Sequence, residues 1–231
     1  MSLANGSHCQ HQDRLAEIKV GFYRKWQFPG VIGCVDGTHV AIRTPPRNED
    51  VFVCRKGFHS INIMLIDDHK NRITAVSARF PGSSHDMAVF DCSNIQQRME
   101  NGDLENKGLL LADSGYALRP YLMTPVLRPH NDQEVRYNAA HKGTRVSIEQ
   151  ANGILKSRFR CLDRSSGGLF IEAGKACKAI VACCVLHMCI TFHDVMVEML
   201  PNDVHNDDVE RCPELDVNGR IVRDNLIRNA F

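Results

Sequence analysis

The alternation of apolar and polar positions predicts one helix and three strands in the first half of the chain. Residues 13–26 carry apolar side chains at helical spacing, which predicts a short amphipathic helix after a polar start that we expect to be disordered. Strands are predicted at 31–43, 58–66 and 72–80, where apolar residues alternate or run together. The second and third strands are expected to pair as an antiparallel hairpin, because the polar turn at 67–71 separates them.

The second half of the chain is predicted to be mainly helical, with one further strand. A helix capped by Ser83 or Ser84 is expected to reach about residue 100. The strand at 109–113 is wholly apolar, as is typical of a central strand covered on both faces. A long, proline-bearing connection follows, and then a helix at 146–160 and an apolar, cysteine-rich helix at 171–200.

This order of elements predicts an α/β fold in which an antiparallel hairpin joins parallel strands in one mixed sheet. The 231 residues, of which 43% are apolar, suffice for a single sizeable core. We expect a partly helical segment at 1–27, one domain at 28–200 and an acidic, flexible tail at 201–231, with a short helix near 222–227.

Charge and cysteine content narrow the class of function. Basic residues outnumber acids between 136 and 164, which favours a polyanionic partner, whereas acids outnumber basic residues after 201. The ten cysteines include no C-x-x-C pair, so reduced thiols in an intracellular protein are expected rather than zinc knuckles or disulfides. The apolar run at 179–192 is too short to span a bilayer, and we predict a buried helix and no membrane partner.

Two carboxylates interrupt apolar strands. Asp36 lies in the middle of the first strand between Gly33 and Gly37, and a charge there must be paired, bind a cation or face water. Glycines within a strand often mark the close approach of a ligand or another backbone. Asp113 ends the short apolar strand, where α/β sheets gather functional groups. Each acid taken alone is also compatible with an ordinary turn.

A third carboxylate, Glu149, lies on the helix predicted at 146–160. It begins a polar row with Asn152, Lys156 and Arg160, because residues three or four apart share a helix face. The alternative is an ordinary amphipathic helix with a solvated face.

Other acids have local explanations. Asp86 lies in the first turn of a helix, where it complements the helix dipole, although a role in a site stays open. Asp67 and Asp68 are expected to be solvated turn formers in the hairpin.

Six blocks of the sequence, in this order, resemble the DDE endonuclease domain of PIF/Harbinger transposases and of the Harbinger transposase-derived nucleases. The resemblance covers about residues 28–186. The blocks are GCVDGTHV at 33–40, KGFHSIN at 56–62, PGSSHD at 81–86, ADSGY at 112–116, YNAAH at 137–141 and TRVSIEQANGILKSRF at 144–159.

The resemblance implies an RNase H-like fold and metal-dependent cleavage of DNA. It implies that Asp36, Asp113 and Glu149 are catalytic and bind a divalent cation together with Asp86. Oxygen ligands of this kind favour Mg²⁺ or Mn²⁺ over zinc. The cations expected to contact DNA phosphates, which give affinity without sequence readout, are Arg145, Lys156, Arg158 and Arg160.

The resemblance also implies partners and a location. These are DNA, a Myb-like DNA-binding protein, a second copy of the chain as a homo-oligomer, and the nucleus, with the cytoplasm as an additional location. Members of the family usually carry a longer helical region before the first strand than the roughly 30 residues found here, so a partial or domesticated form stays open. The alternative function is therefore a DNA-binding or scaffold protein whose acids no longer act.

Overall fold

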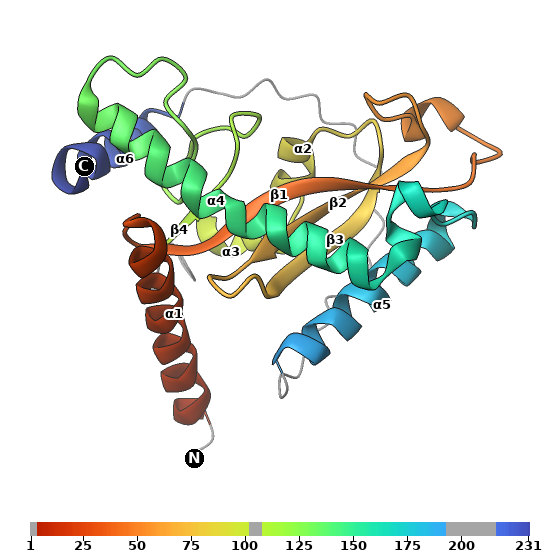
Figure 1. The fold of residues 1–231 in the computed structure, drawn as a ribbon, viewed down its shortest axis with the longest axis horizontal. Helices are drawn as coiled ribbons and strands as arrows, with labels where there is room; N and C mark the ends of the chain where they lie inside the picture. Colours follow the sequence, from red (N-terminus) through yellow and green to blue (C-terminus); the bar gives the residue numbers. More distant parts are fainter. Residues whose placement is uncertain (1–3, 102–107, 193–215) are drawn as a thin grey trace.

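A five-stranded mixed sheet forms the centre of the protein, whose computed structural model describes residues 4–101, 108–192 and 216–231 (Figure 1). The strand order is β3-β2-β1-β4-β5. The strands are β1 (Val31–Ala41), β2 (Ser60–Asp67), β3 (Ile73–Pro81), β4 (Leu109–Leu111) and β5 (Leu122–Met123). Neighbours from β3 to β1 pair antiparallel and neighbours from β1 to β5 pair parallel. The predicted α/β mixed sheet is confirmed, and it is RNase H-like.

Helices cover both faces of the sheet. They are α1 (Ala4–Trp26), α2 (Asp86–Asp91), α3 (Asn94–Glu100), α4 (Asp132–Arg158), α5 (Ala173–Phe192) and α6 (Val217–Ala230). Short 3-10 turns lie at Glu49–Phe52, Arg160–Leu162 and Arg164–Ser166. One buried cluster joins a face of the sheet to α1, α4, α5 and α6, and a second joins the other face to α2 and α3. Neighbouring residues of β1 enter different clusters, because successive side chains of a strand point to opposite faces of the sheet.

Helix α4 is longer than predicted, because it begins at Asp132 instead of residue 146. The cap is Asn131, whose side chain accepts a hydrogen bond from the Glu134 backbone N–H at 2.8 Å. Its buried face includes Tyr137, Ile148 and Leu155, so the helix packs along its whole length against the core. The connection before it also contains the short strand β5, which was not predicted because the prolines around it favoured a loop.

The single helix predicted up to residue 100 is two helices, α2 and α3. Cys92 is the C-cap of the first helix, and Ser93 caps the second by accepting a hydrogen bond from the Gln96 backbone N–H at 3.2 Å. The predicted serine cap of α2 is wrong, since His85 occupies the cap position. Residues 4–12, expected to be disordered, extend α1 instead.

Helix α6 contains the short helix predicted near 222–227 and is longer, so residues 217–230 are not part of a flexible tail as expected after residue 201. Ile227 is buried, and the Phe231 ring lies 5.5 Å from Phe28 and 5.7 Å from Tyr137 between ring centroids. These apolar contacts hold residues 217–231 against α4 and the sheet, although the region is rich in polar residues. Residues 201–215 of the predicted tail lie outside the described part of the chain.

Helix α5 is 20 residues long and apolar, so by length and composition it could cross a membrane. One such helix is weak evidence for a membrane span, because core helices pass the same test. Every fourth residue, Ala176, Ile180, Cys184 and Met188, is buried and packs in the cluster on the sheet. The helix is therefore half-buried, rather than buried as predicted, and residues 193–200 lie outside the description. All the cysteines whose side chains the structure describes are free thiols.

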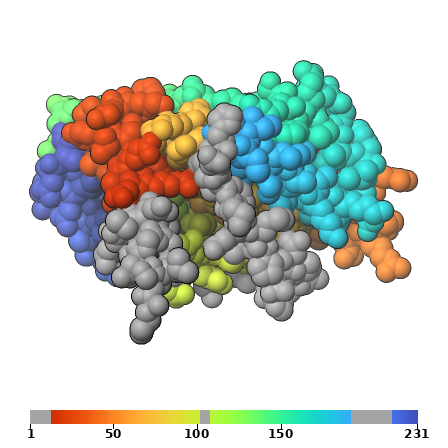
Figure 2. All heavy atoms as spheres, turned by 90° about the horizontal axis from the view of Figure 1, so that it is seen from below, coloured from red at the N-terminus to blue at the C-terminus, as the bar shows by residue number. Residues whose placement is uncertain are grey.

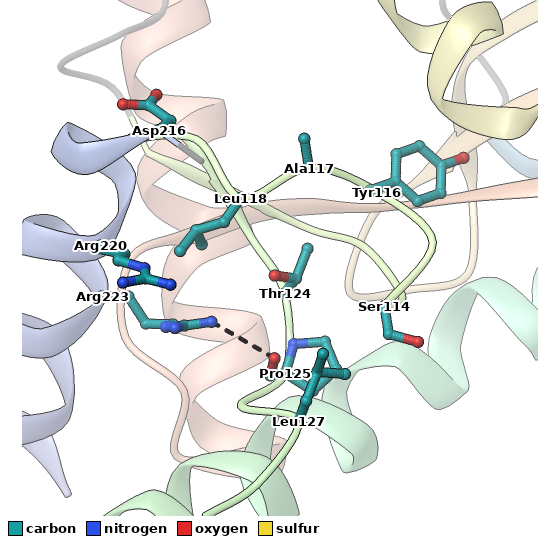
Figure 3. A pocket seen from close by; sticks show the side chains of 10 residues that line it. All are labelled: Ser114, Tyr116, Ala117, Leu118, Thr124, Pro125, Leu127, Asp216, Arg220 and Arg223. Atoms are coloured by element: carbon teal, nitrogen blue, oxygen red, sulfur yellow. Dashed lines mark hydrogen bonds between the residues drawn. The ribbon is translucent and has the colours of Figure 1, made fainter. Parts of the chain in front are cut away.

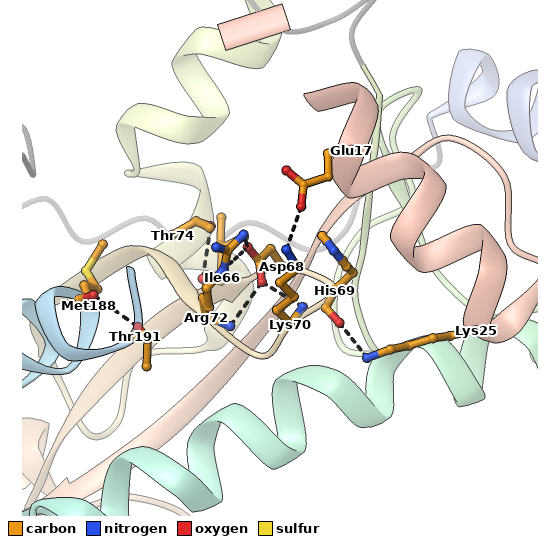
Figure 4. Close-up of polar contacts among 10 residues, drawn as sticks. All are labelled: Glu17, Lys25, Ile66, Asp68, His69, Lys70, Arg72, Thr74, Met188 and Thr191. Atoms are coloured by element: carbon orange, nitrogen blue, oxygen red, sulfur yellow. Dashed lines mark hydrogen bonds and ion pairs between the residues drawn. The ribbon is translucent and has the colours of Figure 1, made fainter. Parts of the chain in front are cut away.

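The β2–β3 turn also departs from expectation, because Asp67 and Asp68 are both fully buried. Asp68 accepts hydrogen bonds from the side chain of Arg72 and the backbone N–H of Lys70, at 2.7 and 2.8 Å (Figure 4). Lys70 in turn forms an ion pair with Glu17 of α1 at 2.6 Å. The turn lies between α1 and α5, which share the face seen in Figure 2. These acids therefore anchor the turn rather than face the solvent.

Candidate acidic active site

Asp36 lies near the middle of β1, paired across the sheet with Leu65 of β2. Its side chain is 21% exposed and has two partners on α4. Arg145 donates to Oδ1 at 3.1 Å and Asn152 donates to Oδ2 at 3.2 Å. Because these residues are seven apart, both project from the same side of the helix toward β1. The carboxylate is therefore held in place by one cation and one amide.

The other predicted acids reach the same region from separate elements. Asp113 lies two residues beyond β4, which is parallel to β1, and accepts a hydrogen bond from the Gly115 backbone N–H at 2.8 Å. Asp86 is the first residue of α2, and Asn62 of β2 donates to its Oδ1 at 2.7 Å. Glu149 is exposed on α4, one turn after Arg145.

A glycine makes room for one of these acids. A Cβ at Gly37 would overlap the Asp86 carboxylate, so that carboxylate lies against the β1 backbone at Gly37, on the face of the sheet that α2 covers. Asp36 points to the opposite face, toward α4. Gly33 has a different neighbour, since a Cβ there would lie 2.9 Å from the Asp67 backbone oxygen. Both strand glycines therefore mark close approaches, as their position in a strand suggests.

The pKa of Asp36 reports the proximity of the acids. Burial raises the pKa of this carboxyl to about 6, the Arg145 guanidinium opposes the rise, and Asp113, Asp86 and Glu149 each raise it further. Like charges disfavour ionisation only over short distances, because salt and water screen distant ones. The four predicted acids thus share one electrostatic environment.

Buried polar atoms without a partner gather around this environment. Among the described residues they include Oδ1 of Asn62 and of Asn152, Nε of Arg145 and the hydroxyl of Tyr116. Burial raises the pKa of Tyr116 well above its ordinary value, and Asp86, Asp36 and Asp113 raise it further. A buried polar group normally has a hydrogen-bond partner, so this concentration indicates a place where water or a ligand binds.

The chemistry of the donors fits a hard divalent cation, because every candidate ligand is a carboxylate or amide oxygen. The geometry is more open than a formed site. Within the described residues no three Asp, Glu, His or Cys side chains lie close enough together to hold an ion. Arg145 instead supplies positive charge at Asp36. To bind an ion here, the carboxylates would have to move closer to one another and Arg145 would have to release the Asp36 carboxylate.

The cations predicted to contact DNA all have partners within the chain. Lys156 donates to the Thr38 hydroxyl at 2.7 Å and to the His39 carbonyl at 3.1 Å. Arg158 is bonded to His187 at 2.9 Å, and Arg160 donates to the Ser166 hydroxyl at 3.1 Å. Arg158 and Arg160 are exposed, whereas Arg145 points into the acidic site. Their contact with DNA stays a prediction.

A basic pocket of about 250 Å³ begins directly after Asp36 on β1. Lys156, which the sequence predicted as a DNA contact, lines this pocket, and so do Lys56 and Arg164, which the sequence analysis missed. The Arg164 guanidinium lies 4.3 Å above the centroid of the Phe58 ring. Lys56 lies in the turn before β2 and Arg164 begins a 3-10 turn far away in the chain, so no local pattern links them.

The RNase H-like sheet, with carboxylates on β1 and beyond the adjacent parallel strand β4, places the protein among α/β domains that carry an acidic site at this edge. A family model described as DDE superfamily endonuclease matches residues 35–188, which include all four acids. The chain belongs to this family.

Curated relatives agree with the family. The chain is 36% identical over 219 residues to proteins of Bos taurus and Homo sapiens named "Putative nuclease HARBI1", covering 93% of this chain and 62% of theirs. It is 26% identical over 240 residues to "Protein ALP1-like" of Arabidopsis thaliana, covering 95% of this chain and 58% of that protein. The chain thus spans about three fifths of the length of these relatives. No solved structure matches it.

Proposed function

We propose that the protein is a divalent-metal-dependent endonuclease that hydrolyses phosphodiester bonds in DNA. The observation that carries the proposal is that β1, the start of α2, the end of β4 and α4 each bring one carboxylate to the same region. These are Asp36, Asp86, Asp113 and Glu149, and the last three lie near enough to raise the pKa of the first. The family supports nuclease activity, and the named nucleases of cattle and human are similar over most of this chain.

Asp36, Asp113 and Glu149 are the proposed catalytic carboxylates, and Asp86 joins them in holding Mg²⁺ or Mn²⁺. When bound, such an ion polarises a phosphoryl oxygen and lowers the pKa of water. Asn62 and Asn152 orient Asp86 and Asp36 through their amide NH₂ groups, and the amide oxygen of each is buried without a hydrogen-bond partner. No protein nucleophile is needed for this chemistry.

The DNA backbone is proposed to continue from the acids into the basic pocket lined by Lys56, Lys156 and Arg164. Thr38 follows Asp36 by two residues, about 7 Å along a strand, so the Lys156 ammonium lies near the next position of a bound backbone. Phosphate contacts of this kind fix the register of the substrate without reading its sequence. Arg158 and Arg160, exposed on and just after the end of α4, are proposed as further phosphate contacts.

Nicking of supercoiled plasmid in the presence of Mg²⁺ tests the proposal. Asp36→Asn and Asp113→Asn are expected to abolish nicking while the fold stays intact. Asp224→Asn, an exposed carboxylate on α6, is the matched control. DNA binding that weakens with salt but never leads to turnover would support the alternative of an inactive DNA-binding protein.

The partners expected from the resemblance are also proposals. A Myb-like DNA-binding protein would supply sequence recognition, which phosphate contacts lack. Co-purification tests the Myb-like partner, and the mass of the protein in solution tests the homo-oligomer. Imaging of the tagged chain tests its location in the nucleus or the cytoplasm.

A further inference from the structure

A second pocket, of about 360 Å³, lies on the other side of the acidic site, between α6 and the segment that follows β4 (Figure 3). This volume is at the small end of the range for ligand sites in proteins. Its apolar walls include Leu118 and Leu127, and Leu127 is 80% exposed at its edge.

Two arginines line the same pocket. Arg220 and Arg223 are three residues apart on α6, so they project from one face of the helix. Arg223 donates to the Pro125 carbonyl at 3.4 Å, and its buried Nε has no hydrogen-bond partner. Within the described part of the chain neither guanidinium forms an ion pair with a carboxylate. Asp216 also lines the pocket, and its Oδ1 accepts hydrogen bonds from the backbone N–H groups of Asn218 and Gly219. With two guanidinium groups against one carboxylate, the pocket keeps an excess of positive charge beside an apolar wall.

The pocket and the acidic site share a wall. Ser114 lines the pocket and directly follows Asp113, and Tyr116 also lines it. The unpartnered hydroxyl of Tyr116 lies within the field of Asp36, Asp86 and Asp113. A strand of DNA held by the acids would thus reach the pocket within a nucleotide or two.

We propose that this pocket binds one unpaired nucleotide of the DNA strand, with its phosphate on Arg220 and Arg223 and its base against Leu118 and Leu127. A guanidinium matches a phosphate geometrically, and apolar side chains accept the face of a base. A bare phosphate would leave the apolar wall unused. The inference rests on the proposed function for its ligand and uses residues of α6, which lies beyond the part of the chain that the family model matches.

Fluorescence binding with the full chain in EDTA tests the pocket without cleavage. The two probes are a fully paired duplex and the same duplex with one unpaired 2-aminopurine nucleotide. Wild type is expected to prefer the second probe, and Arg220→Ala with Arg223→Ala to lose about tenfold of that preference. Each lost phosphate contact should reduce the slope of log affinity against log salt by about one. Arg228→Ala, exposed on the same helix and outside the pocket, is the matched control.

A third variant separates base from phosphate. Leu127→Ala should weaken the change in 2-aminopurine fluorescence and leave the salt slope as in wild type. If the arginine variants and Arg228→Ala show the same preference for the unpaired probe and the same salt slope, the pocket does not bind the nucleotide. If the 2-aminopurine signal in Leu127→Ala is unchanged, the base does not contact Leu127. If Arg223→Ala fails to fold, the exposed Arg220 carries the test alone.

The two proposals fail in different ways. A wild-type protein that nicks plasmid but shows no effect of Arg220→Ala retains the proposed function and loses this pocket. A protein that shows the arginine effect and never nicks retains the pocket and loses the nuclease.

Discussion

The Arg145 guanidinium donates to the Asp36 carboxylate, with 3.1 Å between Nη2 and Oδ1. The side chains are only 13% and 21% exposed, so water screens the pair weakly. A divalent ion that binds Asp36 needs the same oxygen atoms. Arg145 and a bound ion would therefore compete for these oxygen atoms.

Replacing Arg145 by Ala should tighten binding of Mn²⁺. Removing one nearby positive charge is expected to raise the affinity about tenfold, which corresponds to roughly 1.4 kcal/mol. Isothermal titration calorimetry at pH 8, where Asp36 is ionised, measures the change. Lys142→Ala, an exposed cation on the same helix, serves as control and should leave the affinity within twofold of wild type. Unchanged or weaker binding in Arg145→Ala would show that the guanidinium does not compete.

Binding of Mn²⁺ should also depend on pH through Asp36, whose pKa is raised to about 6 by burial. A carboxylate must lose its proton before it binds a metal, so the affinity should fall about tenfold for each pH unit below about 6. The native state holds this proton more tightly than the unfolded chain, so the contribution of Asp36 to stability falls as pH rises from about 4 to 6. Titrations from pH 5 to pH 8 measure the affinity, and the Asp36→Asn variant should lose this dependence.

The sequence alone predicted strands β1 to β4, and it predicted Asp36, Asp113 and Glu149 as candidate site residues, because their signals are local. A carboxylate in an apolar strand and a polar row on a helix can each be recognised within ten to fifteen residues. The start of α4 had a local signal too, since Asn131 and Glu134 form a helix-capping pattern, but the prolines before it favoured a loop.

Other features depend on contacts between distant segments and could not be predicted. The Arg145 contact with Asp36 joins residues 109 positions apart. Lys56 and Arg164 meet only in the folded pocket, and the burial of Asp67 follows from the packing of α1 and α4 over the β2–β3 turn. Periodicity assigns residues to a helix or strand face, but it does not say which faces meet.

Asp67→Asn should stabilise the protein at neutral pH. Burial raises the pKa of Asp67 well above its ordinary value, although its Oδ1 accepts a hydrogen bond from the Cys34 backbone N–H at 3.2 Å. The native state therefore binds a proton that the unfolded chain releases near pH 4, and stability falls as pH rises through this window. Asn stays neutral and keeps the acceptor.

Urea unfolding of the Asp67→Asn variant at several pH values measures this effect. The variant should be about 1–2 kcal/mol more stable than wild type at pH 8, and the difference should vanish below pH 4. The exposed Asp224→Asn variant should match wild type across the range. A loss of stability at every pH would mean that the buried carboxyl is needed for its geometry rather than tolerated as a neutral acid.

Phe231→Ala should loosen α6 from the core. The ring packs against Phe28 and Tyr137, and its removal is expected to cost about 2 kcal/mol, less than a fully buried Phe because Phe231 is only half-buried. Thermal unfolding should show a fall of about 4–8 °C in Tm. Val217→Ala on the same helix is the control, because Val217 is 68% exposed and its truncation should change little. Equal Tm values for the two variants would contradict the packing of α6 against the aromatic cluster.

The two glycines of β1 offer a matched pair that separates the site from the fold. A Cβ at Gly37 overlaps only the end of the Asp86 side chain, which can rotate away, so Gly37→Ala should displace one acid and leave the strand intact. A Cβ at Gly33 lies 2.8 Å from Ile66 Cγ2 and 2.9 Å from the Asp67 backbone oxygen, and neither can move freely in the core.

Gly37→Ala is therefore expected to lower Mg²⁺-dependent nicking at least tenfold with a change of less than about 0.5 kcal/mol in the free energy of unfolding. Gly33→Ala is expected to cost about 1–3 kcal/mol of stability and to retain nicking at a temperature where it is folded. The pair is measured by urea unfolding and by plasmid nicking on the same preparations. If Gly37→Ala nicks as well as wild type, Asp86 has no part in binding the metal, and the proposed site reduces to the other three carboxylates.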